Sequence, residues 1–279
     1  MRWNLKEKAT MKRVAAIQMA SGPNIDANLI EAGRSIQAAA DAGARLIVLP
    51  ENFALMGLSE SDNLKFAEKE GSGKIQDFLS EQAEKNKAWI VGGTTPIAAD
   101  EPDKINAACL VYDDQGKRVA RYDKIHLFDV EIIDSGENYT ESMTIKPGNE
   151  AVVVDSPFGK LGLAICYDLR FPELFRTLLD KGAEIFVVPS AFTAITGRAH
   201  WEVIVRARAI ENLSFVIAAA QGGYHVSGRE TFGDSMIVDP WGTVLDRLPS
   251  GSGFVVADID EDRLKSIRRN FPAIDHRKI

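Results

Sequence analysis

The sequence lacks the features of several large protein classes. Its 279 residues include only two cysteines, which excludes a disulfide scaffold and a zinc site with four thiolate ligands. It has no apolar run of about 18 residues, so we expect no membrane-spanning helix, and its first residues do not form a secretory signal. The 33 Lys and Arg against 40 Asp and Glu give a net charge of −7, which is untypical of a nucleic-acid binder. We therefore expect a reduced, cytoplasmic protein that binds neither membranes nor nucleic acids.

Several common catalytic motifs are also missing. The chain contains no G-x-S-x-G motif, no phosphate loop ending in GK[ST], and no G-x-G-x-x-G after a predicted strand. The four histidines are scattered and lack the spacing of metal ligands. These absences argue against serine hydrolases, P-loop and Rossmann proteins, and metalloenzymes.

The hydrophobic pattern that is present indicates an α/β protein. Residues 13–19 and 46–50 are short apolar runs typical of strands, and residues 26–42 have helical spacing between them. The segment GARLIVLPENF at 43–53 matches GAEIFVVPSAF at 182–192 in its Gly-Ala pair, its four apolar residues, its proline and its final phenylalanine. This match predicts two related halves.

The rest of the chain continues the same alternation. Further strands are predicted at 88–97, 107–114, 117–124, 160–166, 215–220, 234–239 and 253–259, helices at 172–180 and 199–213, and a polar loop at 129–150. No linker rich in Pro, Ser or Gly separates these elements. We therefore predict one domain over 13–279, preceded by a polar tail over 1–12.

Three reactive side chains lie at the carboxyl ends of predicted strands, where open α/β sheets place their sites. Glu51 follows 46–50, Lys124 follows the RVARYD run at 118–123, and Cys166 ends the run at 160–166, before a helix whose N-terminus favours a thiolate. Each also has a simpler interpretation: Glu51 as an ion-pair partner, Lys124 as a surface lysine and Cys166 as a small buried hydrophobic residue. Cys109, inside an apolar run, is predicted to be a core residue.

The motifs around these residues resemble the three signatures of the nitrilase, or carbon–nitrogen hydrolase, superfamily. They are LPENF around Glu51, YDKIHLFD around Lys124 and ICYDLRFPELFR around Cys166, and two later blocks extend the match to about residue 260. The resemblance implies a four-layer α-β-β-α sandwich with pseudo-symmetric halves. It also implies a homodimer or higher homo-oligomer, and the helix over 199–213, apolar nearly all round, is expected to be buried on more than one side.

The same resemblance implies how the site would work. Glu51 acts as general base, and Cys166 attacks the carbonyl of a primary amide, a small-molecule substrate, releasing ammonia and leaving a thioester. Lys124 and the backbone N–H of Tyr167 hold the oxyanion, and Glu141 orients Lys124. The reaction needs neither a metal nor an organic cofactor.

Residues 190–222 resemble the deaminated glutathione amidase branch, and ω-amidase, which acts on 2-oxoglutaramate, is its neighbour. Both substrates carry an α-keto carboxylate, for which Arg170 and Arg198 are the candidate partners. Arg198 and Asp234 depart from the branch pattern and are expected near the mouth of the site. An N-carbamoyl amidohydrolase, a nitrilase and a non-catalytic scaffold stay open as alternatives, although the intact Glu51, Lys124 and Cys166 count against a scaffold.

Overall fold

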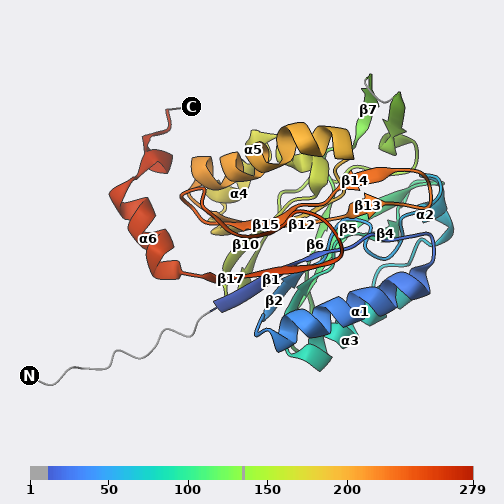
Figure 1. The fold of residues 1–279 in the computed structure, drawn as a ribbon, viewed down its shortest axis with the longest axis horizontal. Coiled ribbons are helices and arrows are strands. Elements are labelled where there is room, and N and C mark those ends of the chain that lie inside the picture. The colour runs from blue at the N-terminus through green and yellow to red at the C-terminus, as the bar shows by residue number, and fades with distance from the viewer. Residues whose placement is uncertain (1–11, 134–135, 279) are drawn as a thin grey trace, which may run out of the picture.

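The computed structural model describes residues 12–133 and 136–278, which form two facing β-sheets between two layers of helices (Figure 1). The first sheet has the order β17 (Gly253–Ile259), β1 (Lys12–Gln18), β2 (Leu46–Val48), β3 (Trp89–Val91), β5 (Ile105–Tyr112) and β4 (Thr95–Ala98), and β6 (Arg118–Asp123) also pairs with β5. The second has the order β16 (Val244–Leu248), β15 (Ser235–Val238), β12 (Phe215–Ala220), β11 (Ile185–Ser190), β10 (Gly159–Leu163) and β9 (Val153–Ser156). Residues 1–11 of the predicted tail lie outside the described residues.

The helices complete a four-layer α-β-β-α sandwich, as predicted. Helices α1 (Ile25–Asp41) and α3 (Lys74–Asn86) cover the first sheet, and α4 (Pro172–Asp180) and α5 (Ala194–Asn212) cover the second (Figure 1). Apolar side chains fill the space between the sheets and beneath each helical layer. The short α2 (Asp62–Lys65) lies near one end, and α6 (Glu261–Asn270) with its following turn (Ala273–His276) lies at the other. No helix of the described residues is long and apolar enough to cross a membrane.

The two halves repeat one arrangement, which confirms the predicted doubling. In the first sheet β1, β2 and β3 are parallel, with antiparallel neighbours on both sides. In the second sheet β10, β11 and β12 are parallel and are flanked in the same way. Gly43 and Gly182 follow α1 and α4 with the same φ of +93°, a conformation that glycine adopts at low cost. Both β2 and β11 therefore point their carboxyl ends towards one edge of the sandwich.

The structure differs from the predicted secondary structure in several places. The predicted strand 88–97 is two strands, β3 and β4, because the chain turns at Gly92 and Gly93. Helix α3 was not foreseen, since it is mostly polar and buries only a narrow apolar stripe formed by Ile75, Leu79 and Ala83. The predicted loop 129–150 contains a hairpin of β7 (Asp129–Ile132) and β8 (Glu137–Thr140), whose half-exposed strands have no apolar alternation.

Helix α5 begins at Ala194, five residues earlier than predicted, where the Thr193 side chain caps it. It buries one face, including Trp201 and Val205, while Val203 on the opposite face is 69% exposed. The expectation that this helix is buried on more than one side is therefore wrong within the described part of one chain, where no other element packs over its outer face.

Candidate active site

The three strand-end residues meet at one edge of the sandwich. Glu51 lies just beyond β2, Lys124 directly follows β6, and Cys166 lies just beyond β10 as the first residue of a 3-10 turn (Cys166–Arg170). The Lys124 Nζ donates to Glu51 Oε1 at 2.8 Å and to both carboxylate oxygens of Glu141 at 3.0 and 2.8 Å. Lys124 is 1% exposed. It is therefore a buried cation between two carboxylates and not a surface lysine.

Backbone contacts hold Glu51 in place. The Gln221 side chain donates to the Glu51 carbonyl oxygen at 3.0 Å, and the next residue, Asn52, donates its N–H to Thr94 Oγ1 at 2.8 Å. Gly93, with φ +54°, lies so close to this turn that a Cβ on it would be 2.1 Å from the Pro50 carbonyl oxygen. The turn that presents Glu51 thus depends on close backbone packing.

The turn that presents Cys166 is held by a buried carboxylate. Cys166 has φ +46°, which is uncommon for a residue with a side chain. Asp168, fully buried, accepts hydrogen bonds from the Ile165 N–H at 2.8 Å, from the Tyr122 hydroxyl at 2.6 Å and from His126 Nδ1 at 2.7 Å. No pattern in the sequence around Asp168 predicts this role.

The electrostatics of the cluster define its resting state. Burial raises the pKa of the Cys166 thiol, the Glu51 carboxylate raises it further, and Lys124 only partly opposes them, so this pKa lies well above its ordinary value. Burial by itself would lower the pKa of Lys124, but Glu141 and Glu51 outweigh burial and hold it well above its ordinary value. The resting site therefore contains a neutral thiol and a protonated lysine. Attack by sulfur requires that a base take the thiol proton.

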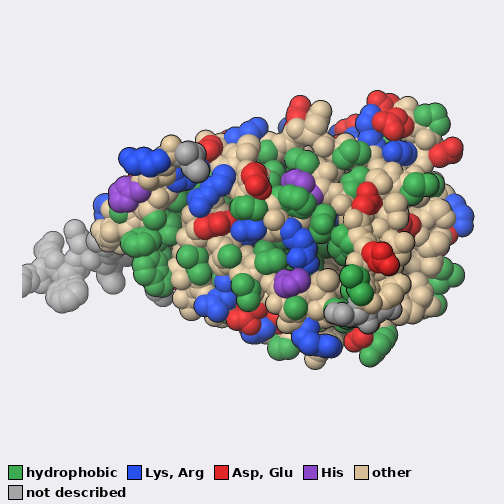
Figure 2. Space-filling view, turned by 90° about the horizontal axis from the view of Figure 1, so that it is seen from above, with side chains coloured by type: hydrophobic (Ala, Val, Ile, Leu, Met, Phe, Trp, Pro, Cys, Tyr) green, Lys and Arg blue, Asp and Glu red, His purple; other side chains and the backbone are tan. Residues whose placement is uncertain are grey.

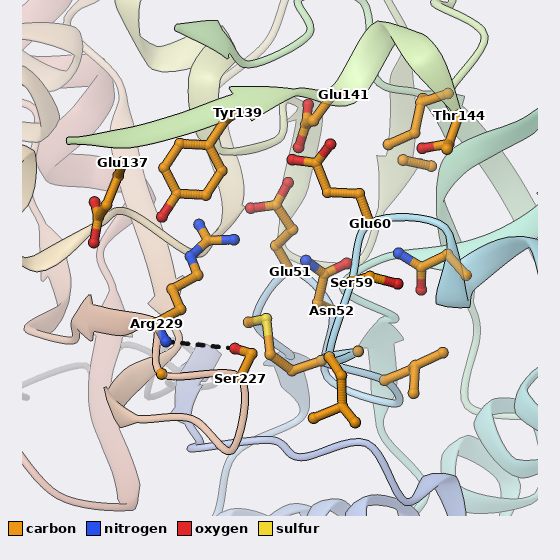
Figure 3. Close-up of a pocket in the computed structure, with 18 of the residues that line it drawn as sticks. Glu51, Asn52, Ser59, Glu60, Glu137, Tyr139, Glu141, Thr144, Ser227 and Arg229 are labelled. Atoms are coloured by element: carbon orange, nitrogen blue, oxygen red, sulfur yellow. Dashed lines mark hydrogen bonds between the residues drawn. The ribbon is translucent and has the colours of Figure 1, made fainter. Parts of the chain in front are cut away.

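Two connected cavities open at this cluster. The inner one is a narrow slot of about 10 Å³ and includes Cys166, Lys124, Tyr167 and Thr196 in its lining. The outer one has a volume of about 450 Å³ and is bordered by the loop around Glu60, the hairpin β7–β8 and the turn between β13 (Gly222–Tyr224) and β14 (Glu230–Phe232) (Figure 3). The residues lining both cavities are Glu51, Asn52, Glu141 and Arg229.

The structure separates the residues that the sequence analysis placed around the substrate. Arg170 lines the inner slot, where its guanidinium lies 5.2 Å from the centre of the Phe192 ring. Arg198 is exposed on α5 and is not among the described residues that line either cavity. Asp234 does not line the mouth either: it is 1% exposed and its carboxylate pairs with Arg247 at 2.6 Å.

A further cation, Arg229, borders both cavities and was not predicted from the sequence. It follows a turn of small residues 63 positions after Cys166, and the sequence holds no motif that marks it. Only the packing of the β13–β14 hairpin against the strand ends brings it to the site. Within the described part of the chain, no group of three or more His, Cys, Asp or Glu side chains is arranged to hold a metal ion.

A doubled α-β-β-α sandwich with a buried cysteine, lysine and glutamate at one edge defines a hydrolase of the nitrilase type. The family model described as carbon-nitrogen hydrolase matches residues 13–269, and the chain belongs to this family. It is 42% identical over 266 residues to the deaminated glutathione amidase of Yersinia enterocolitica, which covers 95% of this chain and 92% of that protein.

Solved structures of related proteins have the same fold as this chain. The C. elegans NitFhit protein superposes with a TM-score of 0.86 at 36% identity, and the match covers 96% of this chain but only 65% of that longer one. Saccharomyces cerevisiae Nit3, described as a member of branch 10 of the nitrilase superfamily, superposes with a TM-score of 0.86 at 31% identity, over 96% of this chain and 97% of Nit3. The chain is thus an enzyme of the carbon–nitrogen hydrolase class.

Proposed function

We propose that this enzyme hydrolyses the amide bond of deaminated glutathione. The observation that supports the proposal most is the contact of Glu51, Lys124 and Glu141 beside the buried thiol of Cys166, in a chain similar throughout to a deaminated glutathione amidase. In this substrate the amide joins a 2-oxoglutaryl group to the amine of cysteinylglycine. The leaving group is then a dipeptide amine, and not the ammonia expected of a primary amide.

The first step forms the thioester. Glu51 takes the thiol proton as Cys166 Sγ bonds to the carbonyl carbon, because a free thiolate beside the Glu51 carboxylate is disfavoured. The carbonyl oxygen becomes an oxyanion. Glu51 then gives the proton to the amide nitrogen, the C–N bond breaks, and the amine leaves.

Donors for the oxyanion are available in the slot. Lys124 carries three N–H bonds, of which one faces Glu51 and at least one faces Glu141. The backbone hydrogen bonds of the nucleophile turn run from Asp168 to Ile165 and from Phe171 to Asp168, so among the described residues they do not use the Tyr167 N–H. Lys124 and Tyr167 N–H together stabilise the charge that develops in the transition state.

The second step hydrolyses the thioester. A water enters from the side vacated by the amine, and Glu51 takes its proton as the oxygen bonds to the acyl carbon. The S–C bond breaks, Cys166 Sγ recovers a proton, and the acid leaves. Glu141 keeps Lys124 in place during both steps: its Oε2 also accepts from the Phe128 N–H at 2.8 Å, so it is itself anchored.

Arg170 binds the α-keto carboxylate of the acyl group. It lies four residues after Cys166 and lines the same slot, and the planar guanidinium matches a carboxylate with two hydrogen bonds. A volume of about 10 Å³ is close to what a single water requires, so side chains that line the slot shift when the acyl group enters. Arg198 has no part in this proposal because it lies outside the cavities.

The test is kcat/KM for deaminated glutathione, 2-oxoglutaramate, an N-carbamoyl amino acid and a nitrile. We expect deaminated glutathione to be the best substrate, with 2-oxoglutaramate second and no turnover by Cys166→Ala. A preference for 2-oxoglutaramate would make the enzyme an ω-amidase. Turnover of only the carbamoyl compound or the nitrile would refute the keto-amide assignment and leave the family unchanged.

We also propose that the enzyme is a homodimer or a higher homo-oligomer. On α5 the apolar Val203 and Ile210 are 69% and 47% exposed, beside the salt bridge from Arg206 to Glu202 at 3.3 Å. Figure 2 shows apolar side chains beside Lys and Arg over this face, and Arg, unlike Lys, is enriched at interfaces. Light scattering at micromolar concentration is expected to give at least twice the 30.6 kDa chain mass, and a 30.6 kDa species alone would contradict the proposal.

A further inference from the structure

Arg229 stands out because of the charges around it. The outer cavity is lined by four carboxylates, those of Glu51, Glu60, Glu137 and Glu141, and Arg229 is the one Lys or Arg among its described lining residues. Figure 3 shows its guanidinium reaching from the turn after Ser227 towards the cavity, next to Tyr139. An anionic group that enters this cavity therefore has a single cation to approach.

The guanidinium is held in position but is not neutralised. One of its terminal nitrogens donates to the Ala191 carbonyl oxygen at 2.6 Å, and its carbon lies 5.0 Å from the centre of the Tyr139 ring. No carboxylate of the described residues forms an ion pair with it, and of its three nitrogens only Nη2 forms a hydrogen bond with another described residue. The other terminal nitrogen, Nη1, can therefore form a charge-assisted hydrogen bond with an anionic oxygen in the cavity.

The course of the reaction indicates which end of the substrate lies in the outer cavity. The acyl group stays bonded to Cys166 while the amine departs and water replaces it, so the amine must lie on the open side. Cys166 lines the slot of about 10 Å³, whereas Glu51, which protonates the amine, borders both that slot and the cavity of about 450 Å³. The larger cavity is thus the exit for the leaving group.

We propose that the outer cavity binds the leaving amine and that Arg229 pairs with a carboxylate at the end of this amine remote from the cleaved bond. This inference rests on the proposed function. The amine leaves with the proton from Glu51, takes up a second proton from water and becomes an ammonium ion that faces the Glu51 and Glu141 side of the cavity, while the carboxylate of the same molecule faces Arg229. A zwitterionic amino acid or dipeptide, of which cysteinylglycine is one, fits this distribution of charge. Arg229 thereby distinguishes a dipeptide amide from 2-oxoglutaramate, whose leaving group has no carboxylate.

The experiment compares three substrates with the same acyl group. They are 2-oxoglutaryl-cysteinylglycine, its C-terminal carboxamide, and 2-oxoglutaramate, each measured as kcat/KM in the full-length enzyme. The variants are Arg229→Gln, which removes the charge, and Arg229→Lys, which keeps the charge but not the fork. Arg269→Gln is the matched control, because Arg269 is exposed on α6 at the opposite end of the molecule.

The wild type and Arg269→Gln are expected to prefer the free carboxylate over the carboxamide by at least about tenfold, the scale of one charge-assisted hydrogen bond. Arg229→Gln should bring this ratio close to one, and Arg229→Lys should give an intermediate ratio. A general loss of activity in Arg229→Gln with the ratio preserved would overturn the inference, since the Ala191 contact alone would explain it. The inference would also be overturned if the wild type cleaved the free carboxylate and the carboxamide equally well. The proposed function would then still stand, because 2-oxoglutaramate and the carboxamide are cleaved. Failure to cleave any of the three would instead refute the proposed function itself.

Discussion

The hydroxyl of Tyr122 offers a direct test of how the nucleophile turn is held. Tyr122 is fully buried on β6, and its hydroxyl donates to Asp168 Oδ2 at 2.6 Å. The same oxygen accepts the Ile165 N–H at 2.8 Å, one residue before Cys166. Burial and the adjacent Asp168 carboxylate both raise the pKa of Tyr122, so the phenol stays a donor at every accessible pH.

The substitution Tyr122→Phe removes one hydrogen bond to a buried charge. Such a bond contributes about 1.5–3 kcal/mol, and in domains of this size about 1 kcal/mol lowers Tm by about 2–4 °C. We therefore expect Tm to fall by about 3–12 °C in thermal unfolding. Because the loosened turn carries Cys166, kcat should fall by about tenfold or more while KM changes less, as a small displacement of a reacting group is costly.

The matched control is Tyr112→Phe. Tyr112 is also buried, on the adjacent strand β5, but its hydroxyl forms no hydrogen bond with any other described residue. This variant should keep its kcat and change Tm by only a few degrees. Equal effects of the two substitutions, or a Tyr122→Phe enzyme with the Tm and kcat of the wild type, would show that the Asp168 network does not hold the turn.

Two further predictions concern the reacting groups themselves. Cys166→Ala should abolish turnover in the substrate assay while its circular dichroism spectrum shows a folded protein. Cys109→Ala should keep turnover, because burial in the core raises the pKa of the Cys109 thiol to about 12. The reverse pattern would make Cys109 the nucleophile. Lys124→Ala and Glu51→Gln should each lower kcat by on the order of a hundredfold or more, and near-normal turnover would remove either residue from the mechanism. The Glu51 carboxylate raises the pKa of Cys166, so Glu51→Gln should lower that pKa and shift the pH profile of alkylation by iodoacetamide to lower pH, although turnover is lost; an upward shift would contradict this electrostatic argument.

Much of this architecture could be predicted from the sequence because it depends on local patterns. The strands at 215–220 and 253–259 and the helix at 172–180 have the predicted bounds, since short apolar runs and a proline in the first helical turn specify them locally. The ion pairs of α5 follow from helical spacing in the same way. Glu51, Lys124 and Cys166 became candidates because each lies at or just beyond the carboxyl end of a strand, and parallel strands bring these ends to one edge. The resemblance of their motifs to the nitrilase signatures then assigned their roles.

Other features depend on contacts between distant segments, and only the tertiary structure decides them. Nothing near Asp168 in the sequence marks Tyr122 as its partner, because β6 and the nucleophile turn meet only when the two sheets pack. Arg198 is nearer to Cys166 in the sequence than Arg229 is, yet it lies exposed on α5. Arg229 lies after the turn of the β13–β14 hairpin and lines both cavities. Sequence pattern fixes which elements form and where each one ends. Which charge is buried, paired or left facing a cavity depends on how those elements pack, and the burial of Asp234 against Arg247 is decided in the same way.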